Sequence, residues 1–246
     1  MQRISLFQCG RAPDASVFGL NWDALWRHRE EFLSGLGLGL KLALIGLALA
    51  CVIGLLVAFA RTSRHRWLSI PAASYVEFIR NIPLLLILFF LYFGVPMWAF
   101  SALPRGVADI LVLDGENTTI VALAIYGGAY LAEVFRAGIL GVGRAFIEAG
   151  RSLGLSGLQI ARYVTLPIMV RTVLPSLGNT FISLFKDTSL AMAIAVPELT
   201  FVTRKFVTDT FQFIQAWTVA GILYLVTTYA LAALLRFLER RIRWTV

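Results

Sequence analysis

Charged residues are scarce in this sequence. Of its 246 residues, 15% are charged and 59% are hydrophobic, and the mean hydropathy is +0.78. A water-soluble domain of this size cannot hide so much apolar surface in its core. The composition therefore excludes a soluble globular protein and predicts an integral membrane protein.

Residues that bind nucleotides or metals, or that catalyse reactions, are equally few. The three lysines (Lys41, Lys186 and Lys205) do not follow a glycine, and the sequence contains no GxxxxGK[ST] phosphate-binding loop. We therefore expect the chain to bind no ATP by that route. His28 and His65 fall on opposite predicted sides of the membrane without a Cys or His cluster, so no metal site is expected. Convergent acid–base residues are also missing, and this excludes an enzyme. The two cysteines are too few for a disulfide framework.

Long apolar runs predict the fold class, an all-α integral membrane protein of about five transmembrane helices. The first run has 25 residues, about 37 Å of helix, which is enough to cross a bilayer. Asn81 and Pro83 should interrupt the second run, and Pro175 and Gly178 should weaken the fourth. A polar N-terminal segment covers residues 1–31, and the membrane domain covers 32–243. The expected spans are 36–60, 71–98, 119–141, 168–196 and 213–236.

Basic residues predict the orientation. Ten arginines follow the first, third and fifth runs, against three basic residues in the loops after the second and fourth runs. Basic loops stay in the cytoplasm, so we expect the N-terminus outside and the C-terminus in the cytoplasm. Lys41, in the first run, should lie near the outer end, where its long side chain can reach the interface.

Charged residues inside predicted spans mark either internal ion pairs or a pathway, since each costs roughly 2.5–3.5 kcal/mol in a membrane. Glu77 with Arg80, and Glu133 with Arg136, are spaced i, i+3 and can pair. The adjacent residues Lys186 and Asp187 point in different directions and need partners elsewhere. Two interpretations stay open for them: they brace the bundle, or they meet a ligand that carries both charges.

A patterned polar segment lies between the third and fourth runs, at 143–167. Read as a helix, Phe146, Ala149, Gly150 and Leu153 share one narrow face, where another protein could approach closely. Gly154 suits the left-handed position that ends a helix. Gly157 allows a second short helix at a new angle, and Pro167 can open the next one. Glu148 should pair with Arg144 or Arg151.

This segment, Glu-Ala-Gly, then Gly154, then Val164-x-Leu-Pro167, resembles the "EAA" loop of membrane subunits of bacterial ABC importers. The sequences at 34–35, 78–84, 128–136 and 184–190 look like the permeases of polar amino-acid importers. Together the resemblance covers most of residues 34–243. It implies an ABC importer permease bundle in the bacterial inner membrane, dependent on a periplasmic binding protein.

The resemblance also implies partners and roles. The chain would dimerise with itself or with a similar permease, and it would contact two cytoplasmic ATPase subunits that bind the ATP. It would receive an amino acid from a periplasmic binding protein. It would lie among membrane lipids and have no nucleic-acid partner. Two alternatives remain: an ABC permease for another small polar solute, and a helical channel-like protein. The expected ATPase-coupling residues are Phe146, Glu148, Ala149, Gly150, Leu153, Gly154 and Pro167. The expected residues of the substrate path are Glu133, Arg136, Asn179, Lys186, Asp187, Thr188 and Ser189.

Overall fold

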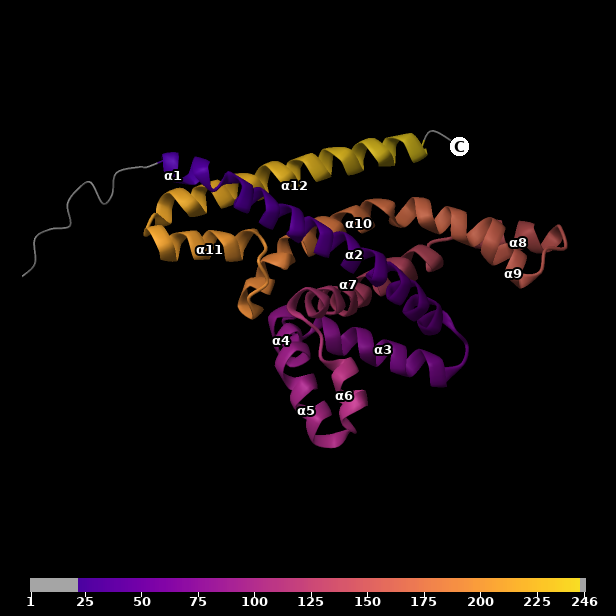
Figure 1. Ribbon diagram of the computed structural model, residues 1–246. Coiled ribbons are helices and arrows are strands. Elements are labelled where there is room, and N and C mark those ends of the chain that lie inside the picture. The colour runs from indigo at the N-terminus through magenta and orange to yellow at the C-terminus, as the bar shows by residue number, and fades with distance from the viewer. Residues whose placement is uncertain (1–21, 244–246) are drawn as a thin grey trace, which may run out of the picture.

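The structure, a computed structural model, describes residues 22–243, and every element of secondary structure in that range is helical (Figure 1). Most of the predicted N-terminal segment, residues 1–21, lies outside the described residues. The helices are α1 (Trp22–Arg27), α2 (Arg29–Thr62), α3 (Arg66–Arg80), α4 (Leu84–Phe89), α5 (Val95–Ala102), α6 (Arg105–Leu111), α7 (Gly115–Leu140), α8 (Arg144–Ser152), α9 (Gly157–Ile160), α10 (Leu166–Asp187), α11 (Leu199–Thr210) and α12 (Phe213–Arg243). The π-helical turns η1 (Phe90–Gly94) and η2 (Ala161–Thr165) and the 3₁₀ helix η3 (Thr188–Ile194) connect them.

Five helical stretches of the described chain are long and apolar enough to cross a membrane, which confirms the predicted fold class. The first begins at Arg29 and not near residue 36, so the predicted boundary between residues 31 and 32 falls inside α2. In Figure 1, α1 and the α11–α12 turn lie at one end of the bundle, and α8 and α9 lie at the other. The five stretches are Arg29–Thr62, Leu84–Ala102, Gly115–Leu140, Gly157–Ile194 and Phe213–Arg241.

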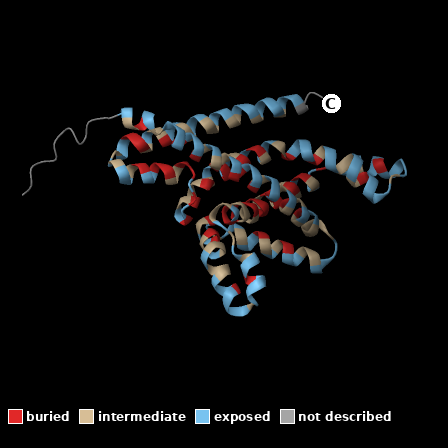
Figure 2. Ribbon diagram, viewed as in Figure 1, coloured by how far each residue is buried: buried red, intermediate tan, exposed pale blue. Residues whose placement is uncertain are grey.

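Small residues hold the centre of the bundle together. Gly54 of α2 packs directly on the backbone of α7 at Gly128 and Ala132, and Gly46 packs on Leu123. Without side chains at these glycines, the two helices approach closely along much of their length. Buried residues gather along α2 and α7, whereas α12 and the α5–α6 arm are largely exposed (Figure 2).

The second span breaks where the sequence predicts. α3 ends at Arg80, Pro83 caps α4, and the Asn81 side chain donates a hydrogen bond to the Glu77 carbonyl. Pro71 lies inside α3, which begins earlier, at Arg66. The predicted pair between Glu77 and Arg80 was wrong: across residues 22–243, neither side chain makes an ion pair.

The fourth span is more continuous than the sequence indicates. We expected a second short helix after Gly157 and a new helix at Pro167, but α9, η2 and α10 form one helical stretch. In the π turn the Leu166 N–H reaches back to the Ala161 carbonyl, so the ladder is already shifted where Pro167 lacks a donor. Pro175 also lies within unbroken α10. The change in helix geometry comes later, at η3, which ends with Ala195 at φ 60°.

Candidate functional site

A cavity of about 380 Å³, open on one side, lies between α7 and α10. The two helices are antiparallel, because Gly127 faces Leu184 while Gly138 faces Met169 and Val173. Apolar atoms make up the larger part of the cavity wall, and hydroxyl, amide and carboxyl groups are set among them. It is lined by Tyr126, Gly127, Tyr130, Asn179, Thr180, Ser183, Leu184 and Asp187.

Of the seven residues predicted for the substrate path, the structure places Asn179 and Asp187 on this wall. Lys186, its neighbour, is exposed and does not line the cavity. Thr188 is buried, where its hydroxyl donates to the Phe185 carbonyl at 2.7 Å. Ser189 does not line the cavity either.

The sequence analysis missed four polar lining residues: Tyr126, Tyr130, Thr180 and Ser183. A signal was present, since polar residues recur every fourth position at 126 and 130, and again at 179, 183 and 187. That spacing puts each set on one helix face.

Glu133 and Arg136 lie in an ion cluster that joins α7 to α2. The Arg136 Nε and Nη2 atoms donate to Glu133 Oε2 at 3.0 and 2.9 Å, and Arg61 of α2 pairs with Glu133 Oε1. The i, i+3 pair predicted from the sequence is therefore confirmed, with Arg61 as a partner that the sequence did not indicate. Neither Glu133 nor Arg136 lines the cavity.

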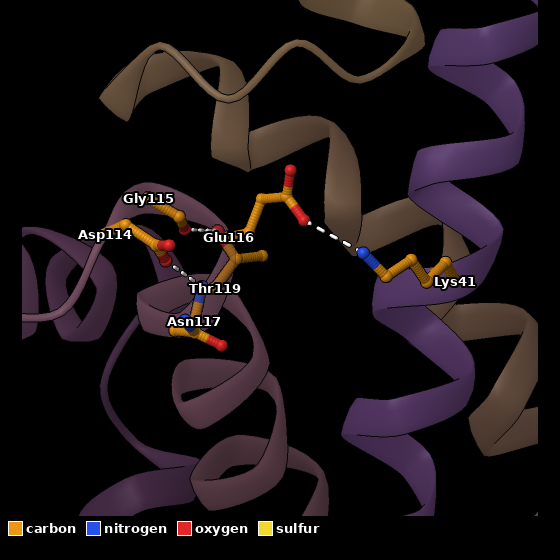
Figure 3. A network of polar contacts seen from close by, with 6 residues as sticks. All are labelled: Lys41, Asp114, Gly115, Glu116, Asn117 and Thr119. Carbon is orange, nitrogen blue, oxygen red and sulfur yellow. Dashed lines mark hydrogen bonds and ion pairs between the residues drawn. The ribbon is translucent and has the colours of Figure 1, made fainter.

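Lys41 was expected to reach the interface alone, but it pairs with Glu116 at the start of α7. Its Nζ atom lies 3.1 Å from Glu116 Oε2 (Figure 3). Beside this pair, Asp114 caps α7 by accepting a hydrogen bond from the Asn117 N–H at 2.7 Å. The contact ties the first span to the start of the third.

Glu198 is a buried acid that sequence reasoning missed. It caps α11, where its carboxylate accepts hydrogen bonds from the N–H groups of Thr200 and Phe201 and from the Tyr224 hydroxyl. Burial raises the pKa of Glu198, and these hydrogen bonds act in the opposite direction. The cap fixes α11 against α12.

The predicted coupling segment forms α8 and a tight turn. Gly154 has φ 74°, as predicted, and the Leu155 N–H closes the turn on the Gly150 carbonyl at 3.1 Å. Gly150 packs against Ile160 of the same chain, whereas Phe146 and Leu153 are 58% and 80% exposed. The narrow face thus divides: its glycine faces α9 and its larger apolar residues face outward.

Glu148 is exposed on α8, and its predicted pairing was wrong. Within residues 22–243, no ion pair joins it to Arg144 or Arg151. On an exposed helix such a pair contributes only about 0.2–0.5 kcal/mol, too little to order two long side chains.

Comparison with known proteins identifies the family. A family model described as "binding-protein-dependent transport system inner membrane component" matches residues 50–244. The chain belongs to this family. It is therefore a multi-pass permease of the inner membrane and not an enzyme.

Similar proteins agree with the predicted amino-acid branch. The permease is 37% identical over 223 residues to the glutamine transport system permease protein GlnP of Escherichia coli K12, covering 91% of this chain and 98% of the relative. It is 32% identical over 215 residues to the octopine transport system permease protein OccM of Rhizobium radiobacter, covering 87% of each.

Solved structures agree in fold. An amino acid ABC transporter solved with histidines superposes with a TM-score of 0.80 at 30% identity, covering 90% of the permease and 99% of that chain. The MetNI methionine ABC transporter, at 17% identity and a TM-score of 0.68, shares the fold.

Proposed function

We propose that this permease imports amino acids, driven by ATP that a separate ATPase binds. The names of its relatives and its likeness to an amino acid ABC transporter support the substrate class. Its partners would be a cytoplasmic ATPase dimer, a periplasmic substrate-binding protein and a second permease subunit, identical or similar. The cavity between α7 and α10 is open on one side, which favours a second subunit that completes its wall.

The observation that carries the proposal is the cavity, with Asp187 as its one charged lining residue. All amino acids carry an ammonium group, and a carboxylate among hydroxyl and amide groups is suited to hold it. Ser183, one helical turn from Asp187, and Asn179 and Thr180, two turns away, add neutral donors and acceptors. In this proposal Asn179 and Asp187 lie on the substrate path. A path role for Glu133, Arg136, Thr188 and Ser189 stays a prediction, whereas Lys186, also predicted from the sequence, is exposed and outside the cavity, and we expect it not to act in the path.

Cysteine protection tests this path. In a cysteine-free background of the complete complex, Ser183→Cys should react with a methanethiosulfonate reagent, since Ser183 lines the open cavity. Saturating L-glutamine or L-arginine should slow that reaction by occupying the same space. Thr172→Cys, on an exposed site of α10 away from the cavity, is the matched control and should show no protection. Equal rates with and without every amino acid at Ser183→Cys would contradict the proposed path.

We also propose that α8 and its turn dock on the ATPase. Phe146, Leu153 and Leu158 are apolar side chains that are largely exposed, with Leu158 82% exposed. Three such residues on one short helical unit form a surface suited to a protein groove. Glu148 and Ala149 are exposed beside them, and Gly154 shapes the turn.

Docking of α8 requires the predicted orientation, with the N-terminus outside and the C-terminus in the cytoplasm. A cysteine at Asp114, at the start of α7, should then react with an impermeant thiol reagent in intact cells. A cysteine at Arg151 should react only after the membrane is opened. Both positions are accessible on the protein surface, so a difference reports sidedness and not burial. The reverse pattern would overturn the orientation and the ATPase contact with it.

A further inference from the structure

Arg80, at the end of α3, has no role in the function as proposed so far. Its guanidinium carbon lies 5.2 Å from the ring centroid of Tyr130, and Tyr130 lines the cavity. Within residues 22–243, no carboxylate lies within ion-pair distance of Arg80, although Glu77 is three residues away on the same helix. Arg80 does not itself line the cavity, but it is a cation stacked on a lining residue and, within the described residues, makes no ion pair.

The Tyr130 ring fixes where that cation stands. A guanidinium over an aromatic face is attracted by the ring and keeps its N–H groups free to donate in its own plane. The Tyr126 hydroxyl donates to the Tyr130 hydroxyl at 3.2 Å, which restrains the ring from the neighbouring turn of α7. The guanidinium is thus held with unused donors beside the cavity.

The register of α7 and α10 places Tyr130, on which Arg80 stacks, at a different level along α7 from Asp187. Gly127 faces Leu184, so Asp187 is level with residue 124 of the antiparallel helix. Tyr130 lies six residues further along α7, which is about 9 Å of helix. An α-amino acid carries its ammonium and its carboxylate on one carbon atom. With one hydrogen bond of about 2.8 Å from each group, the molecule spans a comparable length.

We propose that Arg80 binds the α-carboxylate of the substrate while Asp187 holds its ammonium group. This inference rests on the proposed amino-acid function of the same cavity. The site then carries one charge of each sign, placed for the two charged groups that all α-amino acids share. A guanidinium can grip a carboxylate through two parallel N–H donors, which makes it selective for a free carboxylate over an amide.

Direct binding measurements on the purified permease–ATPase complex test the inference. The probes are radiolabelled L-glutamine, L-arginine and their α-carboxamides, which keep the ammonium group and lack the carboxylate. The wild-type complex should bind an amino acid at least about tenfold more tightly than its α-carboxamide, as expected for a hydrogen bond between charged groups. Arg80→Met should weaken binding of the amino acid to the level of the α-carboxamide and leave α-carboxamide binding unchanged. Arg80→Lys should restore part of the difference.

The control is Arg66→Met, the same change at the other end of α3, where the arginine is exposed and far from the cavity. It should bind both probes as the wild type does. An Arg80→Met complex that still prefers the amino acid, or that weakens both probes equally, would overturn the role of Arg80 and leave the proposed function standing. A wild-type complex that binds none of the probes would instead overturn the proposed path, and the inference with it.

Discussion

Gly154→Val is expected to stop transport while ATP hydrolysis continues. Gly154 has φ 74° in the turn after α8, and a β-branched residue in that left-handed conformation is strained by roughly 1–3 kcal/mol. The turn would relax toward a negative φ and re-aim the exposed apolar residues that we propose to dock on the ATPase. Uptake by the reconstituted complex should fall about tenfold or more, since 1.4 kcal/mol already corresponds to a factor of ten. The five spans do not depend on this turn and should still insert.

The matched control is Gly157→Val, three residues further along. A side chain at Gly157 would meet nothing within 4 Å, and its φ is not positive, so valine is tolerated there. Uptake and ATP hydrolysis are measured together in proteoliposomes for both variants. Wild-type uptake by Gly154→Val would sink the coupling role of the turn. Equal losses of uptake in the two variants would show that the segment does not tolerate a larger side chain at either position, whatever its backbone conformation.

Asp187→Asn is expected to abolish most uptake without loss of thermal stability. Asp187 lines the cavity and, within the described residues, makes no ion pair, so its removal breaks no internal brace. Asparagine keeps the shape and removes the charge that would hold the substrate ammonium. A hydrogen bond to a charged group contributes about 1.5–3 kcal/mol, which predicts a loss of at least about tenfold in uptake.

Lys186→Met is the comparison variant that helps to decide whether Asp187 lines the path or braces the bundle. Lys186 adjoins Asp187 but is exposed and outside the cavity, so its neutralisation should leave both uptake and stability near the wild type. Uptake and the melting temperature of the purified complex are compared for the two variants. If Asp187→Asn lowers the melting temperature and stops uptake of acidic, neutral and basic amino acids alike, the carboxylate is a brace. Unchanged uptake and selectivity would remove it from the path.

The spans and the coupling turn could be predicted from the sequence because their signals are local. Hydropathy over about 20 residues indicates a span, and a glycine such as Gly154 at the end of a helix indicates a left-handed backbone conformation. For the ion pairs, the sequence did not indicate every partner. Glu133 and Arg136 lie on one helix and were found, but Arg61 reaches them from α2, 72 residues earlier in the chain.

Arg80 shows why spacing alone misleads. An i, i+3 acid was at hand in Glu77, yet the guanidinium packs on Tyr130, a residue on another helix. An exposed i, i+3 pair contributes only a few tenths of a kcal/mol, so a contact across helices readily replaces it. The continuity of the fourth span was missed for a related reason. From the sequence alone, Pro167 and Pro175 indicate breaks in the helix. The sequence shows neither the π turn that precedes Pro167 nor the packing of α10 around Pro175.

That continuity has a mechanical consequence. The stretch from Gly157 to Ile194 begins just after the Gly154 turn that we propose to dock on the ATPase, and it carries Asp187 near its far end. Between the two, Met169 and Val173 contact α7 at Gly138. In the proposed complex this contact would act as a pivot. A tilt of the α9 end by the ATPase would move the Asp187 end in the opposite sense. Binding at two coupled sites is reciprocal. A substrate that opposes or favours this movement would therefore change the free energy of nucleotide binding by the same amount.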